Sequence, residues 1–318
     1  MKRPLLAILA VAVFCRAAAA GAQKHDSGNE GQGQAVVTVI PAHGAEQAIE
    51  VAPQDIREVK VDGKSSQVTG WTPLRGSDSP IELVLLMDPS ARSSLGTQLS
   101  EFAKFAEEMP PNMTMAFAYM NAGQAQLAGP LSSNPQQVLQ GLHLPTGPLG
   151  AGASPYFCLS DLARNWPSHN RSARRIVVLV SDGVDYYNLR YDPEDPYVQA
   201  AIQDSVRAGL IVYALYWKNA GRIDRYGWAQ DAGQNLLLEV TEATGGNSYW
   251  EGMGNPVTFQ PYLRDVRIRL NNQYQLSFTA PFGDKPAIAR LDVKASIPSA
   301  KIDAPQQVLV RPVGEALQ

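Results

Sequence analysis

Three short runs of almost uninterrupted hydrophobic residues constrain the fold of this 318-residue chain more than any other feature. They are residues 81–87 (IELVLLM), 176–180 (IVVLV) and 210–215 (LIVYAL). A strand with one face in water alternates apolar and polar residues, so these runs predict strands that are buried on both faces. Apolar residues at spacings of three and four follow each run and predict helices. Strands that alternate with helices predict an α/β fold with a doubly wound, mostly parallel, Rossmann-like sheet.

The first 22 residues predict export. Lys2 and Arg3 precede a ten-residue apolar run that ends at Phe14, and small residues follow it. This is the pattern of a secretory signal peptide, and the run is shorter than the about 20 residues that span a bilayer. Lipid attachment at Cys15 is the alternative, although bulky Phe14 stands where a small residue is wanted. Cleavage leaves Cys158 as the only thiol, and we expect a periplasmic or secreted protein without a membrane span.

Hydrophobic patterning divides the remainder of the chain. Residues 23–34 are polar and rich in glycine, which predicts a disordered leader. Residues 35–78 and 271–318 hold short β-type runs between turn residues, so each predicts a small β-unit. Residues 79–270 lie between them and hold the α/β alternation. The two β-units pack together as one subdomain if the chain ends lie close to each other, as they often do.

Composition excludes several classes of function. Lys plus Arg is 27 and Asp plus Glu is 30, so the net charge is −3 and a basic footprint for nucleic acid is absent. Two cysteines exclude a disulfide framework and a four-cysteine zinc site. No nucleophile turn, phosphate-binding loop or dinucleotide-binding glycine turn stands where an enzyme would need it. We therefore expect a protein that is not an enzyme.

Polar residues follow two of the buried strands and open one helix between them. Residues 88–94 read DPSARSS, residues 181–185 read SDGVD, and residues 150–154 read GAGAS. Ligands of open α/β sheets bind at the carboxyl ends of the strands, so we expect these loops to converge on one face. Their carboxylates and hydroxyls are hard oxygen ligands that suit Mg²⁺, Mn²⁺ or Ca²⁺. The alternative is that Asp88 and Asp182 only hold turns.

These loops resemble the metal-ion-dependent adhesion site of the von Willebrand factor A (VWA) domain family. Residues 88–92 resemble its Asp-x-Ser-x-Ser motif except at the last position, and residues 181–183 resemble its second acidic loop. Residues 152–155 resemble its glycine-threonine loop, with serine in place of threonine. The likeness covers residues 81–270. Two flanking segments are also similar to an exported bacterial subgroup of the family: 59–64 and 272–278.

The resemblance implies an octahedral metal site that a carboxylate of a partner completes. Carried over to this chain, the candidate ligands are Asp88, Ser90, Ser154 and Asp182, and the metal would be Mg²⁺ or Mn²⁺. Arg92 stands where the family has its second ligand serine, which makes the adhesion site degenerate. Arginine stays protonated, so its guanidinium can take the place of the metal by pairing with the aspartates.

We expect the partner to contact Arg92, Ser93 and Asp185. Ser93 or Ser94 supplies the missing hydroxyl only if the loop shifts its register. Asp185 begins an acidic loop (DYYNLRYDPEDP) that either binds calcium or a basic partner or is simply solvated. The sequence thus predicts an exported adhesion module that binds a protein or a cell-surface ligand and holds a divalent metal weakly at most. The alternatives are a metal-free scaffold of an envelope assembly and, last, a metal-dependent hydrolase.

Overall fold

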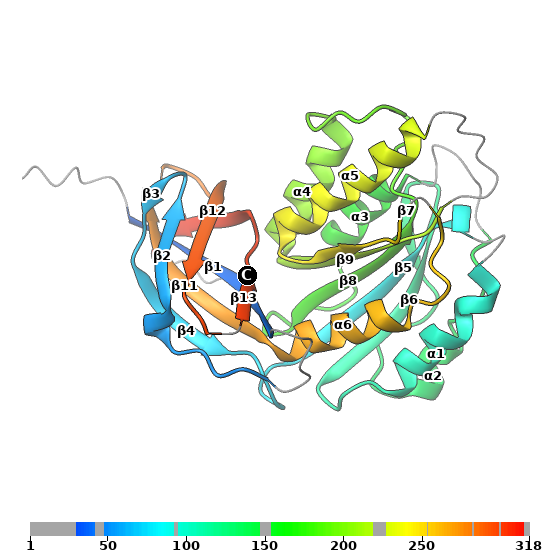
Figure 1. The fold of residues 1–318 in the computed structure, drawn as a ribbon, viewed down its shortest axis with the longest axis horizontal. Helices are drawn as coiled ribbons and strands as arrows, with labels where there is room; N and C mark the ends of the chain where they lie inside the picture. Colours follow the sequence, from blue (N-terminus) through cyan, green and yellow to red (C-terminus); the bar gives the residue numbers. More distant parts are fainter. Residues whose placement is uncertain are drawn as a thin grey trace, which may run out of the picture.

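Two sheets lie side by side in the protein (Figure 1). The computed structural model describes residues 30–41, 48–91, 95–146, 154–218, 227–252, 254–281, 283–298 and 300–314. One sheet has six strands and helices on both of its faces, and the other has eight strands. The predicted signal peptide lies outside the described residues.

The six-stranded sheet has a parallel core and one antiparallel edge. In spatial order its strands are β10 (Asn247–Tyr249), β9 (Leu210–Tyr216), β8 (Arg174–Ser181), β5 (Ile81–Met87), β6 (Met113–Asn121) and β7 (Gln124–Leu127). The four pairings from β10 to β6 are parallel, and β7 returns antiparallel to β6. The turn between β6 and β7 places Ala122 and Gly123 at positive φ. The sheet is therefore mixed, and the sequence patterning did not predict its antiparallel edge strand.

Helices cover both faces of this sheet. On one face lie α3 (Pro155–Arg164), α4 (Pro196–Ala208) and α5 (Trp228–Thr244), and on the other lie α1 (Leu99–Glu107), α2 (Pro135–Leu139) and α6 (Gln260–Asn271) (Figure 1). Two 3-10 turns, η3 (Pro89–Ala91) and η4 (Leu95–Gln98), connect β5 to α1. Leu83 and Leu85 pack into the core beneath α1 and α6, whereas Val84 and Leu86 pack beneath α3 to α5. Both faces of β5 are thus buried, which explains why its sequence is apolar without alternation.

The β-rich segments before and after the α/β region form one antiparallel sheet. The earlier segment provides β1 (Glu30–Pro41), β2 (Ile56–Val61), β3 (Lys64–Ser65) and β4 (Val68–Pro73), with the 3-10 turn η2 (Pro53–Asp55) before β2. The later one provides β11 (Gln273–Pro281), β12 (Ala287–Ala295), β13 (Ala300–Asp303) and β14 (Gln307–Pro312). The order β3-β2-β12-β14-β1-β11-β4 interleaves the two segments, and β13 also pairs with β1. Neither segment forms a complete sheet by itself.

Strand β1 starts inside the segment that was expected to be a disordered leader. That expectation is wrong for residues 30–34, which pair with β11 from the Glu30–Pro281 register onward. At Gly33, packing explains why this glycine-rich segment has a glycine. A Cβ atom there would lie 2.6 Å from the ring of Phe278 in β11, so the aromatic ring occupies the space of the missing side chain. Composition alone does not distinguish such a strand from a flexible linker.

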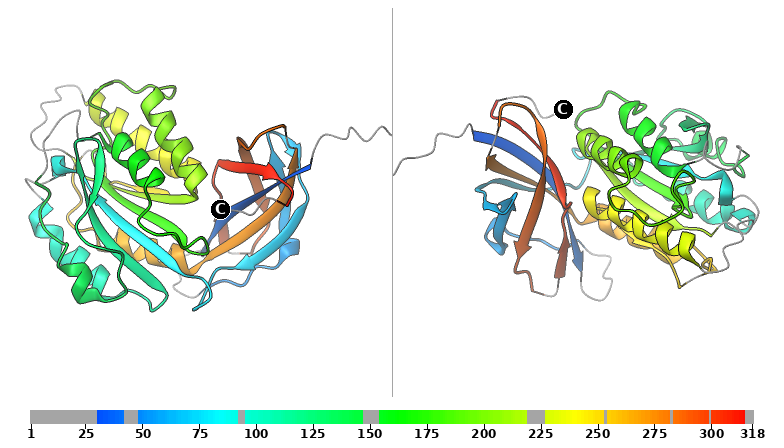
Figure 2. Two further views of the ribbon diagram at one scale, coloured as in Figure 1. Left: turned by 180° about the vertical axis from the view of Figure 1, so that it is seen from behind. Right: turned by 90° about the horizontal axis from the view of Figure 1, so that it is seen from above.

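Polar contacts join the two halves of the molecule, which lie side by side in both views of Figure 2. Arg269 of α6 donates from Nε to Asp265 and from Nη1 to Asp303 of β13, both at 2.6 Å. Gln306 donates from its backbone N–H and from Nε2 to Glu242 of α5, both at 2.9 Å. These contacts hold the α/β half against the antiparallel sheet.

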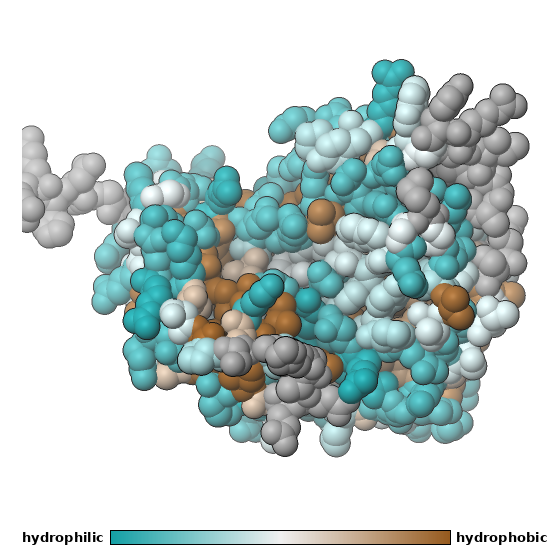
Figure 3. Space-filling model, in the orientation of Figure 1, coloured by the Kyte–Doolittle hydropathy of each residue, from teal (hydrophilic) through white to brown (hydrophobic). Residues whose placement is uncertain are grey.

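The surface differs between the two halves. On the face seen in Figure 3, hydrophobic residues gather over the antiparallel sheet, whereas the α/β half is mainly hydrophilic. None of the helices in the described ranges combines the length and the hydrophobicity needed to cross a membrane.

We predict that Gly246→Ala destabilises the protein strongly. Gly246 follows α5 and packs against β9, where a Cβ atom would lie 1.8 Å from the carbonyl oxygen of Val212. Because backbone must move to relieve the overlap, the free energy of unfolding should fall by about 3 kcal/mol, the upper part of the range for overpacking. Urea denaturation followed by circular dichroism measures this change.

Gly129→Ala is the matched control, since no atom lies within 4 Å of its Cβ position. Its stability should change by less than about 0.5 kcal/mol. Equal stability of the two variants would contradict the close approach at Gly246.

Candidate functional site

One serine hydroxyl joins the loops that follow β5 and β8. Ser181, the last residue of β8, donates from Oγ to Oδ2 of Asp88 at 2.7 Å and accepts the backbone N–H of Gly183 at 3.0 Å. Oδ1 of Asp88 accepts the backbone N–H of Ser90 at 2.7 Å, which fixes the start of its own loop. The backbone N–H of Asp88 donates to the carbonyl oxygen of Val180 at 3.0 Å. The parallel register of the two strands brings these groups to the same edge of the sheet.

The loop after β8 lies directly against α5. Oδ1 of Asp182 accepts the backbone N–H of Val184 at 3.0 Å, so the carboxylate closes the turn. Gly183 has a φ of +68°, a conformation that side chains rarely adopt. A Cβ atom on Gly233 of α5 would lie 2.1 Å from the carbonyl oxygen of Asp182. The helix backbone therefore supports the position of Asp182.

The start of α3 reaches the same loop through two side chains. Ser154 occupies the N-cap position of α3, but its side chain makes no capping hydrogen bond. Its Oγ instead donates to Oδ1 of Asp185 at 3.4 Å. Oη of Tyr156 donates to the carbonyl oxygen of Gly183 at 2.6 Å. Burial, and then the charges of Asp185 and Asp182, raise the pKa of Tyr156 well above 10, so this hydroxyl stays protonated.

The structure thus gathers the candidate ligands Asp88, Ser90, Ser154 and Asp182 in one buried cluster. None of the four is more than 3% exposed. Arg92, Ser93 and residues 150–153 lie outside the described residues. The cluster is at the end of the six-stranded sheet that points away from the antiparallel sheet (Figure 1).

Asp185 differs from the expectation of a solvated acidic loop or an exposed partner contact. It is buried, and its Oδ1 accepts the backbone N–H of Tyr187 at 3.1 Å besides the hydroxyl of Ser154. Desolvation raises its pKa above the ordinary value. Asp195, from the same acidic segment, is also buried and accepts the backbone N–H of Tyr197 at 2.9 Å as the N-cap of α4. Both carboxylates turn inward because they satisfy backbone donors.

The cluster provides a chemically suitable set of oxygens for a hard divalent ion. Within the described ranges, Oγ of Ser90 and Oδ2 of Asp185 are buried without a hydrogen-bond partner. Leaving such a group unpaired costs about 1–3 kcal/mol, so the site favours a ligand there. Among the described residues no three His, Cys, Asp or Glu side chains form a metal-holding group. Serine hydroxyls would therefore have to complete a ligand set built on Asp88 and Asp182.

Exposed aromatic and aliphatic side chains lie on the loop that leads from Asp185 to α4 and on the first turn of α4. We call Tyr187, Leu189, Tyr191 and Tyr197 the tyrosine patch; its members are 41–57% exposed. The rings of Tyr187 and Tyr197 pack edge-on around Phe157 of α3, at centroid distances of 5.2 and 4.8 Å. Two members of the patch are therefore held by α3, the helix that Ser154 precedes, and the hydroxyl of Tyr191 donates to Glu239 of α5. A run of tyrosines in an otherwise polar loop is its signal in the sequence.

We predict that Ser181→Ala destabilises the protein by about 1–3 kcal/mol, because it removes a hydrogen bond from the buried carboxylate of Asp88. Ser205→Ala is the matched control. Ser205 of α4 is fully buried, and its Oγ has no hydrogen-bond partner among the described residues. Ser205→Ala should leave the free energy of unfolding unchanged or raise it slightly. Chemical denaturation measures both, and a loss at Ser181 no larger than that at Ser205 would contradict the structural role of the Asp88–Ser181 contact.

Comparisons with known proteins give similarities of fold only. The sequence matches no protein-family model and no curated protein sequence. An aerotolerance-related membrane protein from Bacteroides fragilis is 16% identical, with a TM-score of 0.38 over 60% of this chain and 99% of that chain. The vWF domain of the type V pili tip protein Mfa5 from Porphyromonas gingivalis is 10% identical, with a TM-score of 0.42 over 62% and 96% of the two chains. The pilus adhesin SpaC from Lactobacillus rhamnosus GG is 10% identical, with a TM-score of 0.45. The match covers 84% of this chain and 49% of that chain. All three TM-scores are below 0.5, so these similarities establish neither a family nor a function.

Proposed function

We propose that this chain is an exported protein-binding module of the VWA type. Its binding face consists of the loops after β5 and β8, the start of α3 and the tyrosine patch. The observation that carries the proposal is the buried cluster around Asp88 and Asp182, in which Ser90 and Asp185 each keep an oxygen without a partner among the described residues. A positively charged group or a bound cation is the natural complement of such a cluster.

The tyrosine patch supplies the apolar part of this face. Tyrosine is enriched in protein interfaces because its ring offers a large contact area and its hydroxyl remains able to hydrogen-bond. Tyr187 and Tyr197 are preorganised by their ring contacts with Phe157, and Tyr191 by the hydrogen bond from its hydroxyl to Glu239, so little freedom of these side chains is lost on binding. The buried cluster and the patch together combine charge recognition with apolar contact, as adhesion to a protein or cell-surface ligand requires.

Arg92 sets the expected strength of metal binding. It follows Ser90 by two positions, where the VWA pattern has a serine, so one hydroxyl ligand is lost and a fixed positive charge is gained. Both changes weaken the attraction of a divalent ion. We propose that Mg²⁺ or Mn²⁺ binds weakly at most, and that recognition of the partner does not depend on metal.

We also propose that this chain binds its partner and does not catalyse a reaction. The sequence has no nucleophile turn and no phosphate-binding loop, which supports this view. The signal-peptide pattern of residues 1–22 supports export.

We predict that Arg92→Ser gives the protein a measurable metal site. Calorimetric titration of Mn²⁺ into metal-stripped mature protein should show weak or no binding, and the variant should bind at least about tenfold more tightly, because one ligand interaction contributes that factor or more. The double variant Arg92→Ser/Ser90→Ala should lose the gain. Equal affinity of the native protein and Arg92→Ser would contradict the role given to Arg92.

We predict that the tyrosine patch is needed for partner binding. A partner captured from an envelope extract and then purified should bind Tyr187→Ser/Tyr191→Ser at least about tenfold more weakly, since central interface aromatics often contribute more than 1 kcal/mol each. Val313→Ser is the control, because Val313 is 60% exposed and follows β14 in the other half of the molecule. Unchanged binding by the patch variant would favour the scaffold alternative.

A further inference from the structure

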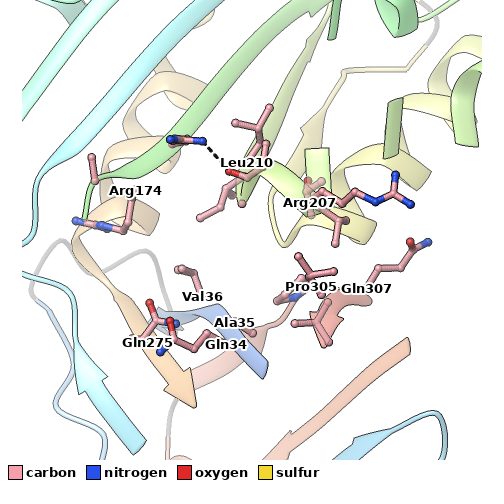
Figure 4. Close-up of a pocket in the computed structure, with 18 of the residues that line it drawn as sticks. Gln34, Ala35, Val36, Arg174, Arg207, Leu210, Gln275, Pro305 and Gln307 are labelled. Atoms are coloured by element: carbon pink, nitrogen blue, oxygen red, sulfur yellow. Dashed lines mark hydrogen bonds between the residues drawn. The ribbon is translucent and has the colours of Figure 1, made fainter. Parts of the chain in front are cut away.

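A cleft between the two halves of the molecule is lined by arginines. It has a volume of about 220 Å³ and lies at the amino ends of β8 and β9, facing strands β1, β11 and β14. Figure 4 shows Arg174, Arg207 and Leu210 on the α/β side, with Gln34 and Gln275 on the opposite side. The cleft is at the other end of β8 from the buried acidic cluster. It therefore has no part in the binding face proposed above.

The charge of the cleft is the reverse of that of the whole chain. Five arginines line it, and none of its lining residues in the described ranges is Asp or Glu. They are Arg171, Arg174, Arg175, Arg207 and Arg311. The chain has a net charge of −3, so these arginines form a local concentration of positive charge, in which Arg207 is also paired with Asp204 of its own helix at 3.7 Å. Like charges held at one place repel one another, and a bound anion relieves that repulsion.

Arg174 is among the most buried of these cations. It is only 7% exposed, and its Nη1 donates to the carbonyl oxygen of Leu270 at 2.9 Å and to Oε1 of Gln273. Both acceptors are uncharged, and its Nε has no hydrogen-bond partner among the described residues. Burial lowers the pKa of Arg174 to about 10, which reflects a desolvated cation. The Nε–H is thus a buried donor, and the two acceptors of Nη1, Leu270 and Gln273, lie outside the lining of the cleft.

Arg175 is held beside the cleft by uncharged groups. Its guanidinium lies over the ring of Trp166 at 5.9 Å from the centroid, and Nη1 donates to the carbonyl oxygen of Ala208 at 3.3 Å. Glu82, whose charge acts on Arg175, accepts the Nε1–H of Trp166 at 2.7 Å and does not line the cleft. The guanidinium is thus preorganised without a carboxylate in the cleft.

We propose that this cleft binds a small organic anion that carries two or more negative charges on phosphate or carboxylate groups. The forked guanidinium group matches the paired oxygens of both groups, and several arginines favour more than one charge. Aliphatic side chains of Val36, Leu210 and Val308 provide contacts for a carbon body. The volume is below the about 300–1,000 Å³ of sites for drug-sized ligands, so the occupant is a small molecule.

The lining comes from both halves of the molecule, so the anion would also join them. Arg171, Arg174 and Arg207 belong to the α/β half, and Arg311 belongs to β14 of the antiparallel sheet. A ligand that contacts both halves binds the folded state alone and therefore raises the melting temperature.

Inorganic phosphate and citrate, titrated separately into the mature protein at fixed ionic strength, test the proposal by calorimetry and thermal unfolding. At least one should bind saturably and raise the melting temperature. Arg171→Gln/Arg207→Gln should weaken binding by at least about tenfold, because hydrogen bonds to charged groups contribute that much. Both residues are exposed, so this variant should fold. Arg174→Lys keeps the positive charge but replaces the forked guanidinium with a single ammonium group. It should also weaken anion binding about tenfold.

Arg57→Gln/Lys64→Gln is the matched control, because it removes two exposed positive charges from β2 and β3, outside the cleft. Its affinity should stay within about twofold of the native value, as expected for screened surface charges. Tighter binding of phosphate would identify a phosphoryl ligand, and tighter binding of citrate a polycarboxylate. Two results would overturn the proposal: no saturable binding of either anion, or equal losses of affinity in the cleft and control variants.

Discussion

Burial of the central strands on both faces is the constraint on which the rest of the molecule depends. Residues of β5 pack alternately into the two cores of the α/β half, so the interior of the sheet has no room for unpaired polar groups. Polar chemistry is therefore confined to the ends of the strands. Strand β8 shows this directly, since it begins with Arg174 and Arg175 and ends with Ser181, which Asp182 follows.

The two ends of β8 have opposite character because different structures meet there. At the carboxyl end, the loops carry carboxylates that accept backbone N–H groups and the hydroxyl of Ser181. At the amino end, the antiparallel sheet approaches and encloses the arginines in a cleft. The two groups of charged residues lie at opposite ends of the same strand, and β8 keeps them apart.

The expectations that differ from the structure share a physical cause. The polarity of residues 30–34 predicted disorder, but β1 gains its hydrogen bonds from β11, which is about 240 residues away along the chain. Asp185 and Asp195 belong to an acidic segment that looks solvated, yet both are buried because they accept backbone N–H groups. In each case a long-range or backbone partner decided the outcome.

The sequence by itself determined the α/β alternation, the extent of that region and the positions of the polar loops that follow β5 and β8. It did so because hydrophobic periodicity is local and directly reports which faces of an element are buried. Only the tertiary structure decided that the two flanking β-segments interleave in one sheet, that Asp185 faces inward and that arginines line a cleft between the halves. These features depend on contacts between residues that are distant in the chain, and no local pattern records such contacts.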